Sequence, residues 1–165
     1  MRDRAVLLLL ARLGLRASDV AALCFDDINW TGARLRVSGK SARPTWLPLP
    51  QEVGDALLRY IETVRPPVGG DGVFLITRAP YTPIIPRQVS STAARAIRRA
   101  GIQAPSFGAH LFRHSAATAW LRQGLTLQAI GTVLRHIDPD TTALYAKVDV
   151  DLLRRIAMPW PDEEA

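Results

Sequence analysis

The spacing of apolar residues along the chain predicts helices over most of its length. Residues 2–13 carry apolar side chains at helical intervals, and the pattern ends at Gly14, a residue type that often follows a helix. Ser18 can cap a second, short helix that runs to about Cys24, with Asp19 near its positive end. The same periodicity predicts further helices at 51–64, 86–100, 109–123, 126–134, 140–145 and 149–156.

One segment changes period and predicts a β-hairpin. Basic and apolar residues alternate over 34–37, the sequence GKSA can form a turn that contains Lys40, and extended structure resumes at Trp46. The prolines and glycines of 65–72 predict a loop. We therefore expect a mainly helical α+β fold with a small antiparallel β-hairpin or sheet near the N-terminal third.

The length and composition are typical of one globular domain. The chain has 165 residues, of which 48% are hydrophobic and 22% are charged. Its longest apolar run, 5–11, is too short to cross a bilayer, so we expect no membrane partner. The single cysteine, Cys24, cannot form an internal disulfide, which fits a reducing cytoplasm. We expect one folded domain over 1–158, followed by a mobile acidic tail at 159–165.

The charge of the chain favours a polyanionic partner. The net charge is +6 at pH 7, and the isoelectric point is about 10.4. Such an excess of basic side chains on a small domain is typical of nucleic-acid binding. A solvated basic surface without a partner would have the same composition.

The stretch HLFRHSAAT at 110–118 combines two histidines with an arginine. On a helix, His110, Arg113 and His114 stand at i, i+3 and i+4 and share one side. A histidine pair at this spacing can bind zinc, but no HExxH glutamate is present and Arg113 would repel a cation. An arginine fork beside a histidine donor suits a phosphate better. The stretch therefore predicts an anion site and no metal.

Three further stretches carry polar residues that could share this chemistry. Arg16 precedes a helix start in GLRASDV, Lys40 lies at the hairpin tip, and LRHIDPDTTALY contains His136 and Tyr145. Taken singly, each of these side chains is more typical of an exposed or structural position. A tyrosine with an ordinary pKa of about 10 is a poor nucleophile at neutral pH unless nearby cations stabilise its anion.

Taken together, the four stretches resemble the catalytic domain of the tyrosine recombinases, the phage integrase family, in its Xer-like form. The matching motifs are GLRASD, the hairpin lysine, HLFRH, LRH and TTALY, in the family's order and at its approximate spacing. The resemblance covers nearly the whole chain and implies the tyrosine recombinase catalytic-domain fold. It also implies site-specific cleavage and rejoining of double-stranded DNA with no cofactor, metal or ATP.

The resemblance implies a role for each residue that matches a motif. Tyr145 would attack a DNA phosphodiester, become joined to the 3′ phosphate and release a 5′ hydroxyl. Lys40 would be the general acid for the departing oxygen, and His110 would act in proton transfer or as a phosphate ligand. Arg16 and Arg113 would hold the non-bridging oxygens and stabilise charge in the transition state.

Other residues of the motifs would support the site or depart from the family pattern. His136 would donate a hydrogen bond to the phosphate, Asp19 would orient the site from behind, and His114 would make a structural hydrogen bond. Phe112 replaces the usual leucine of HxLRH, a change that a core position tolerates. Arg135 replaces the usual glycine before His136 and adds bulk and charge beside the pocket.

The resemblance also sets expectations for assembly and location. Full-length members carry a helical core-binding domain ahead of the catalytic one, and we expect that domain to be absent here. A chain without it would bind DNA weakly and with strong salt dependence. Members act as tetramers on two duplexes, and the segment 149–160 could pass to a neighbouring protomer or pack on its own core. The implied location is cytoplasmic and nucleoid-associated. The alternatives are a type IB topoisomerase-like activity and a DNA-binding remnant without turnover.

Overall fold

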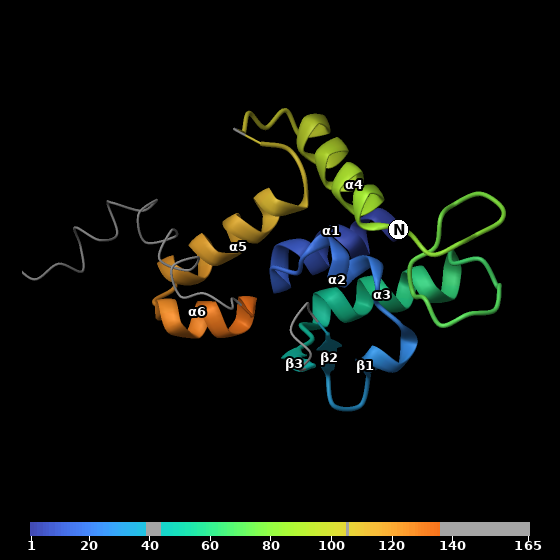
Figure 1. Cartoon of the computed structure of the whole chain (residues 1–165), viewed down its shortest axis with the longest axis horizontal. Coiled ribbons are helices and arrows are strands. Elements are labelled where there is room, and N and C mark those ends of the chain that lie inside the picture. The colour runs from blue at the N-terminus through green and yellow to red at the C-terminus, as the bar shows by residue number, and fades with distance from the viewer. Residues whose placement is uncertain (39–43, 105, 136–165) are drawn as a thin grey trace, which may run out of the picture. The chain divides into compact units, whose positions relative to one another are not determined.

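The computed structural model describes residues 1–38, 44–104 and 106–135. The chain divides into two compact units, Met1–Ala116 and Ala117–Ala165. The described residues form mostly helices, together with one small antiparallel sheet (Figure 1), which confirms the predicted α+β class. Every helix within these ranges is too short or too polar to span a bilayer.

The helix α1 (Arg2–Leu13) packs against three other helices of the first unit. These helices are α2 (Ala17–Ala21), α3 (Gln51–Thr63) and α4 (Pro86–Arg99) (Figure 1). The helical spacing of its apolar residues puts them on one side, where burial from water stabilises the unit. The buried residues of α1 are Ala5, Val6, Leu9, Leu10 and Leu13.

The second helix is capped two residues earlier than predicted. We expected Ser18 to cap a helix reaching Cys24, but α2 starts at Ala17 with Arg16 in the capping position and ends at Ala21. The reason is a better capping partner, because Asp19 Oδ2 accepts a hydrogen bond from the Arg16 backbone N at 2.9 Å. The prediction that Ser18 caps this helix was therefore wrong.

A three-stranded antiparallel sheet follows the order β1-β2-β3. Its strands are β1 (Ile28–Asn29), β2 (Arg34–Val37) and β3 (Thr45–Pro48). Leu35 pairs with Leu47 across β2 and β3, and both side chains are buried on the inner face. The predicted hairpin is therefore confirmed, while β1 was missed because two residues are too few to show an alternating pattern.

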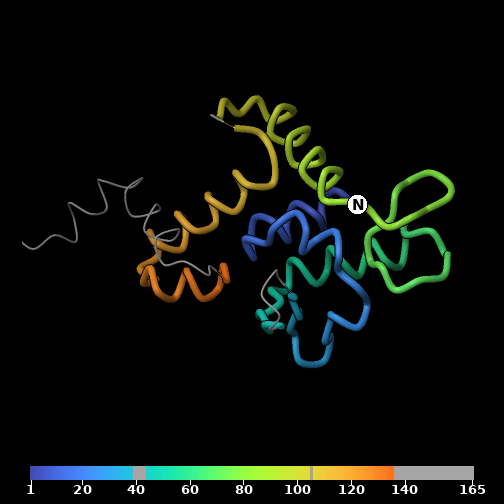
Figure 2. Tube along the Cα trace, in the orientation of Figure 1, coloured from blue at the N-terminus to red at the C-terminus, as the bar shows by residue number. Residues whose placement is uncertain are grey.

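The segment between α3 and α4 is long and largely irregular, and Figure 2 follows it as two successive loops of the tube. The predicted loop at 65–72 lies in its first part. Tyr60 of α3 fixes the segment to the core: its hydroxyl accepts a hydrogen bond from Leu75 N at 3.2 Å, and its ring stacks on Phe74. Arg65 closes the first loop by donating to the backbone oxygens of Val73 and Gly72.

The helix α5 (Ala109–Arg122) runs across the boundary between the two units, and α6 (Leu127–Leu134) belongs to the second. Thr126 begins α6, since its Oγ1 accepts a hydrogen bond from Ala129 N at 3.2 Å. In the part of this unit that the structure describes, Ala117, Ile130 and Leu134 form an apolar cluster, with Trp120 and Leu121 packed against it.

Arg135 ends α6 in a left-handed backbone conformation, with φ 54° and ψ 48°. Glycine adopts this conformation without steric cost, whereas a residue with a Cβ loses about 1 kcal/mol or more. The helix end thus gives a physical reason for the glycine that is usual at this position.

The helices predicted at 51–64, 86–100, 109–123 and 126–134 correspond to α3, α4, α5 and α6. The helices predicted at 140–145 and 149–156, and the tail predicted at 159–165, lie outside the described residues.

Candidate active site

Arg16 lies in the tight turn between α1 and α2. Gly14 ends α1 in the left-handed conformation with φ 59°, which reverses the chain, and Leu15 is buried beneath the turn. Arg16 has an extended backbone and a half-buried side chain. Its backbone N donates to the carboxylate of Asp19, which is only 8% exposed. The buried Asp19 carboxylate therefore stabilises the turn and fixes the backbone position of Arg16.

Arg113 is distant in sequence but is bonded to the same turn. It belongs to α5, is only 5% exposed, and its Nη1 donates to the backbone oxygen of Gly14 at 2.6 Å. A hydrogen bond from a charged donor is stronger than a neutral one and has a defined direction. The structure thus brings Arg113 to the backbone two residues before Arg16, as a phosphate site built from both arginines requires.

His110 and His114 lie one turn apart on α5, as their spacing predicted. Their Nε2 atoms are hydrogen-bonded, and the rings meet edge to face with centroids 4.1 Å apart and planes at 87°. His110 is exposed and His114 is half-buried. Burial, His110 and Arg113 together lower the pKa of His114, which favours its neutral form.

The described residues do not offer a metal site. Among residues 1–38, 44–104 and 106–135, no group of three or more histidine, cysteine or acidic side chains is placed to hold an ion. The two histidines of α5 instead bond to each other, and the cationic Arg113 stands between them in the sequence. Arginine and imidazole N–H groups suit an anion.

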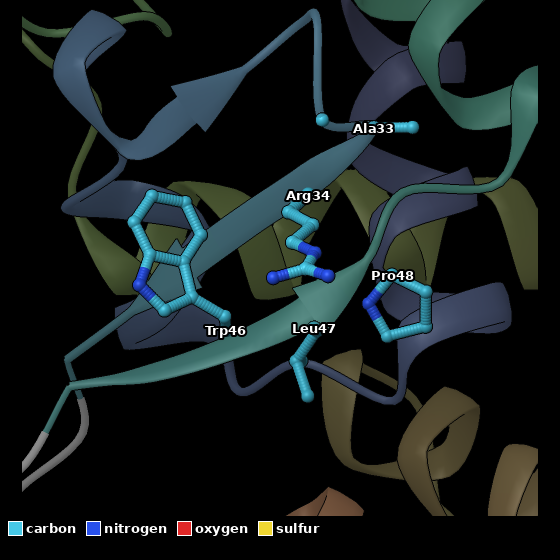
Figure 3. Close-up of a pocket in the computed structure, with 6 residues that line it drawn as sticks. Ala33, Arg34, Trp46, Leu47 and Pro48 are labelled. Atoms are coloured by element: carbon cyan, nitrogen blue, oxygen red, sulfur yellow. The ribbon is translucent and has the colours of Figure 1, made fainter.

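The outer face of the sheet carries a second group of basic and aromatic side chains, on β2 and β3, the strands on either side of Lys40 in the sequence. Figure 3 shows the shallow hollow there, in which the Arg34 side chain lies between Trp46 and Pro48. Arg36 lies over the Trp46 ring at 6.0 Å and is paired with Asp27 at 2.9 Å. This face can contact an anionic partner through exposed groups.

Three of the expected site residues lie outside the described residues: Lys40, His136 and Tyr145. The structure therefore places Arg16, Asp19, His110 and Arg113. Phe112, the variant position of the HxLRH motif, is half-buried on α5.

Two features of this region escaped the sequence analysis. The backbone oxygen of Gly14 holds Arg113, and no sequence pattern identifies a carbonyl as the acceptor of a distant arginine. The sequence predicted a structural hydrogen bond for His114 and placed His110 on the same side of the helix, but it did not identify His110 as the partner.

A comparison with protein families decides the classification. The model of the phage integrase family matches residues 1–151. The chain belongs to the phage integrase family. This membership confirms the resemblance carried by the five motifs.

Curated members of the family align with nearly all of this chain. The putative integrase/recombinase y4rA of Sinorhizobium fredii is 47% identical over 163 residues, which cover 98% of this chain and 40% of that protein. The putative integrase/recombinase y4gC of the same organism is 37% identical over 99% of this chain and 85% of its own length. Tyrosine recombinase XerD of Xanthomonas campestris is 35% identical over 90% of this chain and 48% of its own length. The chain thus spans less than half the length of y4rA and of XerD.

Solved structures share the fold of this family member. The crystal structure of XerA recombinase matches 94% of this chain and 55% of its own with a TM-score of 0.80, at 23% identity. XerH site-specific recombinase, in a post-cleavage complex with its palindromic difH substrate, matches 98% of this chain and 46% of its own with a TM-score of 0.80, at 22% identity. The predicted recombinase fold is thereby confirmed.

Proposed function

We propose that this chain is the catalytic domain of a site-specific DNA recombinase, which cleaves and rejoins strands through a phosphotyrosine at Tyr145. The observation that carries the proposal is the bond between Arg113 and Gly14, which joins two distant family motifs at one turn. Relatives named integrase/recombinase and tyrosine recombinase support the same activity. We assign the domain to 1–158 and the tail to 159–165.

The proposed reaction needs a nucleophile, a charge-binding site and a proton donor. The Tyr145 hydroxyl attacks phosphorus and gives its proton to His110, while the bond to the 5′ oxygen breaks and Lys40 gives that oxygen a proton. Arg16 and Arg113 bind the non-bridging oxygens, with His136 as a further donor. In the rejoining step, a 5′ hydroxyl attacks the phosphotyrosine and Tyr145 leaves.

The geometry around Arg113 suits this charge-binding role. An arginine that is fixed before the reaction need not reorganise when negative charge develops on the phosphate. Arg113 is buried and bonded at 2.6 Å to a backbone oxygen, and the Arg16 backbone is held by Asp19. The guanidinium group of Arg113 and the backbone of Arg16 are therefore both held in place before the reaction.

The partner of this site is double-stranded DNA, and the reaction uses no metal ion and no ATP. Bond energy is kept in the phosphotyrosine, so resealing needs no external source. The net charge of +6 fits a polyanionic substrate. We also propose that protomers assemble as a tetramer on two duplexes, and that the protein acts on DNA in the nucleoid.

Trapping of the covalent intermediate tests this proposal. The protein is incubated with a pool of nicked suicide duplexes of randomised sequence, from which the short fragment that carries the new 5′ hydroxyl diffuses away after cleavage. Denaturing electrophoresis then separates the covalent protein–DNA adduct from free protein and free DNA, and sequencing identifies the attached strands. We expect an adduct with the unaltered chain, with and without a chelator, and none with Tyr145→Phe.

Each other outcome has a definite meaning. An adduct that persists in Tyr145→Phe would show that another residue is the nucleophile. Loss of the adduct in chelator would show that a metal takes part. No adduct from the pool would contradict catalysis by this chain.

A further inference from the structure

His110 and His114 form a hydrogen bond between two nitrogens of the same kind, the Nε2 atoms of their rings. Their Nε2 atoms are hydrogen-bonded across one turn of α5, where residues four apart are neighbours. A neutral imidazole has one N–H and one lone pair. One Nε2 must therefore donate while the other accepts. This direction fixes which nitrogen of each neutral ring carries its proton.

The surroundings of the two rings decide which is the acceptor. His110 is exposed, while His114 is half-buried. Burial, followed by His110 and Arg113, lowers the pKa of His114 and so disfavours its protonated form. A neutral acceptor with its lone pair on Nε2 carries its only proton on Nδ1. When the pair carries one added proton, His114 is therefore the ring that accepts, and His110 donates through Nε2–H.

We propose that His114 is a positioning residue for His110, which holds the Nε2–H of His110 and leaves its Nδ1 for the substrate. The proposal rests on the proposed recombinase function, in which His110 acts in proton transfer or as a phosphate ligand. With Nε2 occupied, the Nδ1 of neutral His110 is a lone pair that accepts a proton. After protonation, the same atom donates a hydrogen bond while Nε2–H stays bound to His114.

This arrangement differs from a purely structural bond between the rings. A structural bond requires only that two polar groups meet, and either direction satisfies it. The proposed role requires one direction, since the opposite one would put the proton of neutral His110 on Nδ1 and remove its acceptor. The direction can be measured without any DNA substrate.

Nitrogen NMR of labelled histidines gives the first test. The chain contains three histidines, so a ¹⁵N-histidine sample gives three ring systems, which His110→Leu and His136→Gln assign. At a pH where the rings are neutral, we expect the His114 proton on Nδ1, the minor tautomer of free imidazole in water. In His110→Leu, the His114 proton should move largely to Nε2. A proton on His114 Nε2 in the unaltered protein would overturn the proposal.

Single-turnover formation of the covalent adduct gives the second test. General acid–base groups typically raise a reaction rate by about 100-fold to 10,000-fold. Because His114 acts only through His110, we expect His114→Leu to slow adduct formation by about tenfold. His114→Gln keeps an acceptor oxygen near the position of Nε2 and should recover most of the rate. DNA affinity should be unchanged in both variants. Ser115→Ala, an exposed neighbour on α5, is the matched control and should keep the full rate.

The outcomes separate this proposal from the proposed function. Equal rates for His114→Leu and the unaltered chain, or no recovery in His114→Gln, would overturn the positioning role. If the unaltered chain forms no adduct, the recombinase proposal fails, and the NMR spectrum still determines the direction of the bond. If His114→Leu does not fold, the tautomer in the unaltered protein and the rate of His114→Gln decide.

Discussion

The turn around Arg16 and the outer face of the sheet both gather arginines, but they hold them differently. At the turn, Arg113 is 5% exposed and donates to a backbone oxygen at 2.6 Å. On the sheet, Arg34 is exposed beside the Trp46 ring (Figure 3). A buried arginine that is hydrogen-bonded has a fixed side-chain conformation. An exposed arginine presents its charge to solvent and can change its conformation. The first suits the stabilisation of a transition state, and the second suits binding of a polyanion.

Replacing Arg113 should have the largest effect, on both stability and reaction. Arg113→Gln removes the donor to the buried Gly14 oxygen and should lower the free energy of unfolding by about 2 kcal/mol. The loss of one oxyanion donor should also slow adduct formation by about 100-fold or more. Urea denaturation measures the first effect, and single-turnover trapping on a suicide duplex measures the second.

Arg99→Gln is the charge-matched control for Arg113→Gln. Arg99 is the exposed last residue of α4, and its replacement should change stability by less than about 0.5 kcal/mol. Equal stability losses in the two variants would show that the bond to Gly14 is not what distinguishes Arg113.

Replacing Asp19 tests whether the turn itself positions Arg16. Asp19→Ala removes the acceptor of the Arg16 backbone N–H and should cost about 1 kcal/mol of unfolding free energy. Adduct formation should fall more than DNA affinity does, because the change displaces Arg16 without removing its charge. The same urea titration and trapping assay measure both quantities.

Asp26→Ala removes an equal charge from an exposed position and should leave stability nearly unchanged. An Asp19→Ala protein with normal stability and rate would contradict a positioning role for the carboxylate.

The sequence predicted the elements better than the contacts between them. Helix boundaries at α1, α3 and α4 follow from apolar spacing, because burial of one face is a local property of the pattern. The cap of α2 was assigned to Ser18, since several residues there could cap a helix and only the folded turn selects Asp19. The two-residue strand β1 exists through its pairing with β2, which a local pattern does not reveal.

The same contrast holds for the candidate site: the sequence predicted its residues better than the contacts between them. Motif order and spacing named Arg16, His110 and Arg113 as one site, because the family resemblance encodes which side chains act together. The bond from Arg113 to Gly14 and the bond between the two histidines depend on how α5 meets the first turn and on local ring geometry. These contacts depend on the folded structure, so the structure alone identified Gly14 as the acceptor for Arg113 and His110 as the partner of His114.

The smallest effect is expected at the sheet, and it should appear in binding alone. Arg34→Gln should change the free energy of unfolding by less than about 0.5 kcal/mol, because Arg34 is exposed. If Arg34 contacts a phosphate, the slope of log affinity against log salt should become shallower by about 1 unit. Arg59→Gln, an exposed position on α3, makes the same change in net charge and should leave the slope unaltered. Fluorescence anisotropy with a labelled duplex over a series of salt concentrations measures both slopes. Equal slopes for the two variants would mean that DNA affinity depends only on net charge. The sheet would then not be a specific DNA-binding face.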